Sequence, residues 1–135
     1  MCYNNMNLKN IERRVLLCGT NYYAVVNKPS LAEPIHIGKN SYGWLFCFQE
    51  QDDKWGDYPI SWHNYNDVKT WLSKHTCGEN PSHVILDEYD RLMSYDEFIK
   101  MVEDKQKDPF NLNNPDNFLY SKNVDGYRFS DGDFS

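Results

Sequence analysis

The sequence predicts an α+β protein: a single compact domain in which an antiparallel sheet carries two short helices packed on one face. Runs rich in β-branched and aromatic residues outnumber helical patterns, and they lie close together along the chain in pairs. No regular alternation of strand and helix is visible, which argues against a parallel sheet. The length of 135 residues suits one domain, so we assign residues 1–135 to it.

Two pairs of short runs predict the first half of the sheet. RRVLLC (13–18) and NYYAVVN (21–27) are separated by Gly19 and Thr20, which favours two strands joined by a tight turn. EPIHI (33–37) and GWLFCFQ (43–49) flank a glycine-containing segment, and their β-branched and aromatic content predicts a hairpin. The turn of that hairpin is expected to begin at Gly38.

Two amphipathic patterns predict helices. In NYNDVKTWLSK (64–74) the apolar residues recur at helical spacing, and Asn64 is an N-cap residue. In SYDEFIKMVEDK (94–105) Ser94 and Glu97 form the S-x-x-E capping box, and an apolar face follows. We therefore expect both segments to begin as capped helices.

The remaining segments are predicted as follows. HVILDEY (83–89) has the composition of a strand, whereas EQDDKWGDYP (50–59) is a polar loop. Residues 108–118 are dominated by Asn, Asp and Pro, which predicts a surface loop. In the tail 123–135 two Asp-Gly turns surround Tyr-Arg-Phe, which we expect to be a closing edge strand. Residues 1–10 are polar and are expected to be a loose N-terminus.

Composition excludes several classes of function. The net charge of -6 and the pI of about 5.1 argue against binding to duplex nucleic acid, which requires an excess of Lys and Arg. No apolar run is long enough for a membrane span, and no signal peptide is visible, so we expect a cytoplasmic protein. No C-x-x-C pair occurs, so we expect no metal, no cofactor and reduced thiols. The scattered cysteines are Cys2, Cys18, Cys47 and Cys77.

The candidate site is centred on the predicted Gly38-Lys39 turn. It is not a Walker P-loop, because Glu33 stands where the first glycine is required and a strand, not a helix, is expected to follow. A turn of small residues can still expose backbone N–H groups to an anion, with Lys39 as the charge and Asn40 and Ser41 as donors. The alternative is a solvated hairpin tip.

Other residue types could complete an anion site. Tyr22, Tyr23 and Tyr127 could stack on a base, and Arg13, Arg14 and Arg128 are the cations best suited to join Lys39. His36 could contact a phosphate, although a histidine on an alternating strand is more often bonded to a neighbour. Asp87 and Glu88 could bind a ribose hydroxyl or a metal, or could simply cap a turn. Trp44 lies on an aromatic stripe for which core packing is the usual role. The predicted ligand-binding residues are His36, Gly38, Lys39, Asn40, Ser41, Trp44, Tyr22, Tyr23, Asp87, Glu88, Tyr127 and Arg128.

Three blocks of the sequence resemble a known family. HIGKNSYGWLFCFQ (36–49), DEYDRLMSYDEF (87–98) and DGYRFSDGDFS (125–135) are similar to a family of small, largely uncharacterised phage-encoded accessory proteins with a HIGKSSxGWxF-like motif. Asn40 replaces the usual serine of the first block, and Asp90 replaces the glycine that usually follows Asp-Glu-Tyr. Both residue types tolerate turn conformations.

The resemblance implies an accessory protein made in the cytosol of a bacterial host, with a role in counter-defence by analogy. We expect it to bind and sequester a small anionic, nucleotide-derived ligand without turnover. The alternative is a protein-binding inhibitor whose acidic, aromatic surface occludes a host enzyme. A structural or assembly factor without a ligand is a further class, and a homo-oligomer is left open.

Catalysis is the less favoured prediction. The sequence contains no G-x-S-x-G, H-E-x-x-H or H-x-E…C-x-x-C pattern. Two carboxylates and a histidine can in principle hydrolyse a phosphodiester, and His36, Asp87 and Glu88 are the residues that would do so. This second alternative rests on residue types that most small proteins contain.

Overall fold

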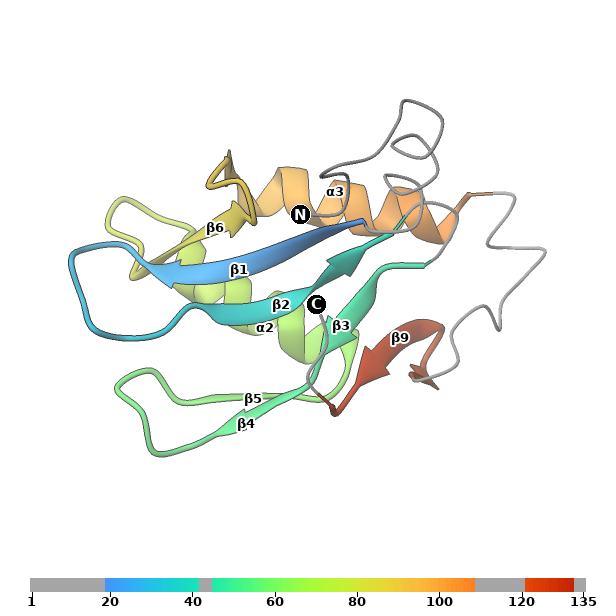
Figure 1. Cartoon of the computed structure of the whole chain (residues 1–135), viewed down its shortest axis with the longest axis horizontal. Coiled ribbons are helices and arrows are strands. Elements are labelled where there is room, and N and C mark those ends of the chain that lie inside the picture. The colour runs from blue at the N-terminus through green and yellow to red at the C-terminus, as the bar shows by residue number, and fades with distance from the viewer. Residues whose placement is uncertain (1–18, 42–44, 109–120, 133–135) are drawn as a thin grey trace, which may run out of the picture.

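The computed structural model describes residues 19–41, 45–108 and 121–132, and the structural statements below concern that part of the chain. It has the predicted α+β class: a seven-stranded sheet, a separate two-stranded sheet and two helices (Figure 1). The strands are β1 (Thr20–Val26), β2 (Ile35–Asn40), β3 (Cys47–Gln49), β4 (Gln51–Asp53), β5 (Ile60–Trp62), β6 (His83–Asp87), β7 (Leu92–Met93), β8 (Lys122–Val124) and β9 (Tyr127–Ser130), and the helices are α2 (Tyr65–Thr76) and α3 (Tyr95–Gln106).

The large sheet has the order β7-β6-β1-β2-β3-β9-β8 and is mixed, not purely antiparallel. The β3–β9 pair is parallel, with Phe48 opposite Phe129, and the other pairs are antiparallel. The prediction of an edge strand at Tyr-Arg-Phe is therefore wrong: β9 lies between β3 and β8, and β8 forms the edge. The turn before it is as predicted, because Asp125 and Gly126 both have positive φ, as a two-residue hairpin turn requires.

Both helices pack on one face of the sheet, as predicted (Figure 1). The Asn64 side chain accepts a hydrogen bond from the Asp67 N–H at 2.8 Å, and Ser94 and Glu97 form a complete capping box. These caps satisfy N–H groups that have no partner within the helix. The core between helices and sheet is aromatic, and its largest fully buried side chains include Trp62, Phe46, Phe48, Phe98 and Phe129.

The predicted hairpin exists, but its turn lies elsewhere. β2 continues through Gly38 and Lys39, which pair with Phe48 and Cys47 of β3. The physical reason is packing: a Cβ atom on Gly38 would lie 2.3 Å from the Cys47 carbonyl oxygen and 2.4 Å from the Phe46 ring. Glycine is required here by the close approach of neighbouring groups, not by a turn.

The polar segment 50–59 is not entirely loop. β4 and β5 pair within and directly after it, with Asp52 opposite Ser61. β6 confirms the strand predicted at 83–89. The predicted strand 13–18, the N-terminus 1–10 and nearly all of the predicted loop 108–118 lie outside the described residues. Within the described ranges, no helix is long and apolar enough to cross a membrane.

Candidate functional site

The predicted site residues fall on two opposite faces of the sheet. Alternation along β1 puts Tyr22 in the core, where its ring contacts Phe98 of α3, and it puts Tyr23 on the outer face. The strand register aligns Asn21 with Lys39, Cys47 and Arg128 in one row across that outer face. The sheet therefore divides the described predicted residues between its two faces.

The outer face holds a small polar cluster beside β1. His36 donates a hydrogen bond through Nε2 to Asn21 Oδ1 at 2.9 Å, and its ring centroid lies 5.3 Å from that of Tyr23. Glu88 Oε1 accepts a hydrogen bond from the Asn21 N–H at 2.9 Å. His36 and Glu88 thus both bind Asn21, and Tyr23 lies against His36; these contacts are internal to the protein.

Three residues of the predicted turn lie within a strand. Gly38, Lys39 and Asn40 lie in β2, opposite Tyr22, Asn21 and Thr20 of β1. The Asn40 amide donates to Met101 Sδ at 3.3 Å, and the Ser41 carbonyl accepts from Lys105 Nζ at 2.8 Å. The predicted turn geometry is therefore wrong, whereas ligand binding by these residues stays a prediction. Trp44, Arg13 and Arg14 lie outside the described residues.

The remaining candidates are occupied by packing or by local hydrogen bonds. Tyr127 stacks on Tyr65 with ring centroids 3.9 Å apart, on the helix side of the sheet. Arg128 is only 4% exposed and lies opposite Cys47, the pKa of whose thiol is raised to about 11 by burial. Burial also raises the pKa of the Tyr22 phenol.

Asp87 closes the turn between β6 and β7. Its carboxylate accepts hydrogen bonds from the N–H groups of Tyr89 at 2.8 Å and Arg91 at 3.0 Å, and from Arg91 Nε at 2.9 Å. Burial opposes ionisation of this carboxyl, but the bonds outweigh burial and lower its pKa. The turn-capping alternative for Asp87 thus describes the geometry found.

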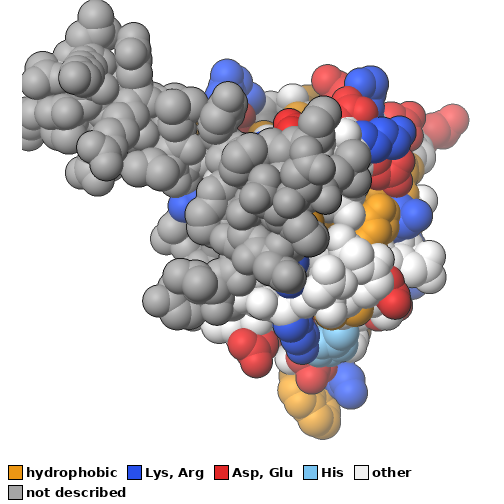
Figure 2. All heavy atoms as spheres, turned by 90° about the vertical axis from the view of Figure 1, so that its right-hand side faces the viewer, with side chains coloured by type: hydrophobic (Ala, Val, Ile, Leu, Met, Phe, Trp, Pro, Cys, Tyr) orange, Lys and Arg blue, Asp and Glu red, His pale blue; other side chains and the backbone are white. Residues whose placement is uncertain are grey.

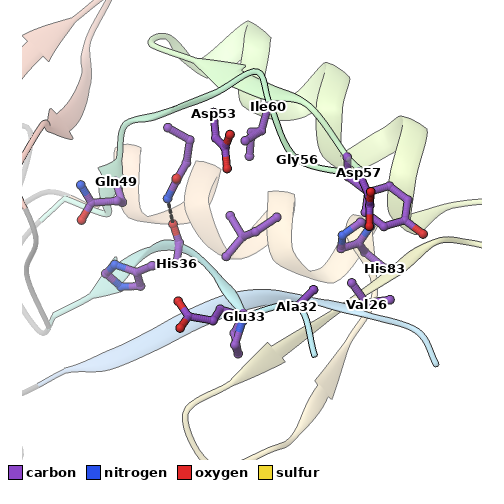
Figure 3. A pocket seen from close by; sticks show the side chains of 14 residues that line it. Val26, Ala32, Glu33, His36, Gln49, Asp53, Gly56, Asp57, Ile60 and His83 are labelled. Carbon is purple, nitrogen blue, oxygen red and sulfur yellow. Dashed lines mark hydrogen bonds between the residues drawn. The ribbon is translucent and has the colours of Figure 1, made fainter. Parts of the chain in front are cut away.

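A cavity at one end of the molecule offers a more open site. It has a volume of about 450 Å³ and lies between the β1–β2 loop and the β4–β5 hairpin, which project at the same end of the fold (Figures 1 and 3). We call it the loop-end pocket. It is lined by Val26, Ala32, Glu33, Pro34, Ile35, His36, Gln49, Gln51, Asp53, Gly56, Asp57, Tyr58, Ile60 and His83.

The charged lining of the loop-end pocket is acidic. Glu33 and Asp53 lie on opposite walls in Figure 3, and Asp57 lies beside His83 in that view. No Lys or Arg is among the described lining residues. The Gln51 amide donates to the His36 carbonyl at 3.0 Å, which ties β4 to β2 across the pocket (Figure 3). The electrostatic field of the acidic lining would attract a cation and repel a phosphate.

His83 contributes a neutral ring to the pocket wall. It is 1% exposed. Its pKa is lowered to about 4, mainly by burial and to a smaller extent by the charge of the nearby His75. Ser82 Oγ lies 2.7 Å from His83 Nδ1 and 3.0 Å from His75 Nδ1, so one hydroxyl links the two rings. A neutral imidazole adds no positive charge to the acidic lining near neutral pH.

The two loops between which the pocket lies each carry one fully exposed apolar side chain. Leu31 lies in the β1–β2 loop and Trp55 in the β4–β5 loop, and each is followed in sequence by a lining residue, Ala32 or Gly56. Sequence reasoning missed this site because it treated both segments as connections. The available signal was an aromatic residue between acids, in Asp-Asp-Lys-Trp-Gly-Asp.

The described residues contain no group of three or more His, Cys, Asp or Glu side chains arranged to hold a metal ion. Comparison of the chain with protein-family models, curated proteins and solved structures finds no match. Functional inference therefore depends on the geometry of the site.

Proposed function

We propose that the protein is a binding protein that captures its ligand in the loop-end pocket without turning it over. The observation that carries this proposal is the lining of the pocket: Glu33, Asp53 and Asp57 with neutral His83 and no basic described residue. Such a site stabilises a group that brings positive charge or hydrogen-bond donors. The ligand is thus cationic at its point of entry, in contrast to the anion expected from Lys39.

Absence of turnover is supported by the position of Asp87, one of the three hydrolase candidates, relative to His36. His36 is on the outer face of the sheet, whereas Asp87 is on the helix side, opposite Tyr22. Asp87 is also engaged by three hydrogen bonds in its own turn. A general base must reach the proton that it removes, and these two side chains do not face one substrate position.

The biological setting remains part of the proposal. The resemblance to phage accessory proteins supports a counter-defence role in the cytosol of an infected bacterium, where a captured ligand or partner would be withheld from the host. Binding without catalysis suits that role, because occupancy alone is sufficient to block a host component.

The proposal is tested with N-ethylguanidinium, using its neutral counterpart N-ethylurea as control. We expect the cation, and not the urea, to shift the amide NMR signals of residues around Glu33 and Asp53. The double variant Asp53→Asn, Asp57→Asn should abolish the shifts, whereas Asp90→Asn, an exposed acid in a turn, should leave them unchanged. Equal shifts with both compounds, or none at the pocket, would remove the cation site.

An anionic ligand on the outer face is the second candidate. The observation in its favour is that Lys39 and Arg128 occupy one row of the same face, to either side of Cys47. On the described surface that faces the viewer in Figure 2, acidic and basic side chains are interspersed. Replacement of Lys39 tests this candidate.

A further inference from the structure

We propose that the loop-end pocket receives a lysine or arginine side chain from a partner protein, while Leu31 and Trp55 pack against apolar surface that flanks that side chain. This inference rests on the proposed function, since it names the occupant of the same pocket. It extends that function from a small cation to a protein surface that presents one basic residue between apolar neighbours.

The two apolar anchors are the first argument. Leu31 and Trp55 are fully exposed, and each is adjacent in sequence to a residue that lines the pocket. Burial of such side chains is favourable in proportion to the apolar area removed from water, and tryptophan is a frequent anchor of protein interfaces. Two anchors in the two loops that line one cavity match a partner wider than a free small molecule.

Local hydrogen bonds hold both loops in shape. The Ala32 N–H donates to Ser30 Oγ at 3.0 Å, which closes a turn around Leu31. The Trp55 N–H donates to Asp53 Oδ1 at 3.1 Å, which closes a turn before the aromatic side chain. Because the anchors are presented by formed turns, less conformational entropy is lost when a partner binds.

Charge decides which partner fits. Glu33, Asp53 and Asp57 line the cavity. The net charge of -6 means that a second copy of this chain would bring further acid to an acidic site. Nucleic acid is excluded from the pocket by the same repulsion. A basic protein segment complements both the pocket and the overall charge, which also accelerates association.

The test uses a yeast-displayed library of random dodecapeptides, sorted for binding to the purified chain. We expect enrichment of peptides that carry Arg or Lys with a large apolar residue nearby. Replacement of that basic residue by citrulline or norleucine in the synthetic peptides should abolish binding. Binding should shift the emission of wild-type protein to shorter wavelengths, and this shift should be missing in Trp55→Phe.

Two sets of variants separate the anchors from the charges. Trp55→Ser should weaken binding of the enriched peptides by about 30-fold, as expected for an interface anchor. Leu31→Ser should also weaken their binding. Leu92→Ser, which removes an exposed leucine from the edge strand β7, is the matched control and should have no effect. Asp53→Asn with Asp57→Asn should abolish binding of peptides and of N-ethylguanidinium alike.

The outcomes distinguish the two proposals. If N-ethylguanidinium binds but no basic peptide is enriched, or if enriched peptides are insensitive to Trp55→Ser and Leu31→Ser, the partner inference is overturned and the cation pocket stands. If neither probe binds at the pocket, both proposals are wrong. Enrichment of peptides without a basic residue would likewise overturn the inference.

Discussion

Ser82 Oγ lies 2.7 Å from Nδ1 of His83, and the His83 ring is enclosed edge-on by Tyr58 at 4.7 Å between centroids. The hydroxyl thereby satisfies one ring nitrogen of an imidazole that is removed from water. Burial of this kind disfavours the protonated form of His83, so the stability of the fold becomes sensitive to acid.

We expect stability to fall as the pH is lowered from about 6.5 to about 4. In the folded protein the pKa of His83 is about 4, against an ordinary value of 6.5, so the unfolded chain binds the extra proton in that interval. The stability that is lost through protonation of His83 amounts to about 3 kcal/mol, and it is fully present above the pKa that His83 has in the unfolded chain. His75 acts in the same direction, because burial lowers its pKa too.

Urea denaturation at a series of pH values measures this effect. The variant His83→Phe keeps a ring in place and removes the titrating group, so its stability should depend less on pH between those limits. Only the slope is compared, because the absolute stability of the variant also changes. Parallel curves for wild type and variant would show that His83 is not the group responsible.

Gly38→Ala should destabilise the fold. The added methyl group would meet the Cys47 carbonyl oxygen and the Phe46 ring, and overpacking of this kind costs about 1–3 kcal/mol. Gly132→Ala is the matched control, since no atom of the described residues lies within 4 Å of its added methyl group, and we expect a change within about 0.5 kcal/mol. Similar thermal unfolding of the two variants would contradict the close approach at Gly38.

Asp87→Ala should reduce stability, not merely function. Three donors of the β6–β7 turn lose their acceptor. A hydrogen bond to a charged group contributes at most about 1.5–3 kcal/mol to the stability of the fold. Arg91→Ala should cost less, because its side chain is largely exposed and exposed ion pairs contribute little. An Asp87→Ala protein as stable as wild type would reopen a functional role for this carboxylate.

Lys39→Ala tests the anion candidate directly. We expect thermal stability to change by no more than about 0.5 kcal/mol, as is usual for a surface position. If the outer face binds an anion, titration with ATP by calorimetry should show weaker binding than for wild type. Lys28→Ala, in the exposed β1–β2 loop, is the control for loss of one positive charge. Equal ATP affinity in the wild type and both variants would exclude Lys39 from any such site.

Local signals in the sequence predicted the helices well. Asn64 and Ser94 begin α2 and α3 as expected, because a cap is a contact between residues three apart. The fold class followed from the same kind of local pattern. Interactions of this range are visible in a single sequence.

The errors arose where distant segments decide the structure. The sequence favours a turn at Gly38, but the residue lies within β2, where a Cβ atom would meet Phe46 and Cys47 across the hairpin. The polar β4 has no apolar alternation, so nothing local marks it as a strand. The loop-end pocket could not be predicted because its walls come from separate parts of the chain, with Glu33 and His83 as examples.

The parallel pairing of β3 with β9 also determines when the sheet can be completed during synthesis. Gln49 and Ser130, which face each other in this pair, are separated by 81 positions in sequence. Until β9 has been made, β3 is an open edge whose Phe48 lacks its stacking partner Phe129. Contacts between such distant residues form late, because the loop between them must first be closed. We therefore expect a nascent chain that ends before β9 to expose an unpaired edge strand, which can pair with other chains and aggregate unless it is protected.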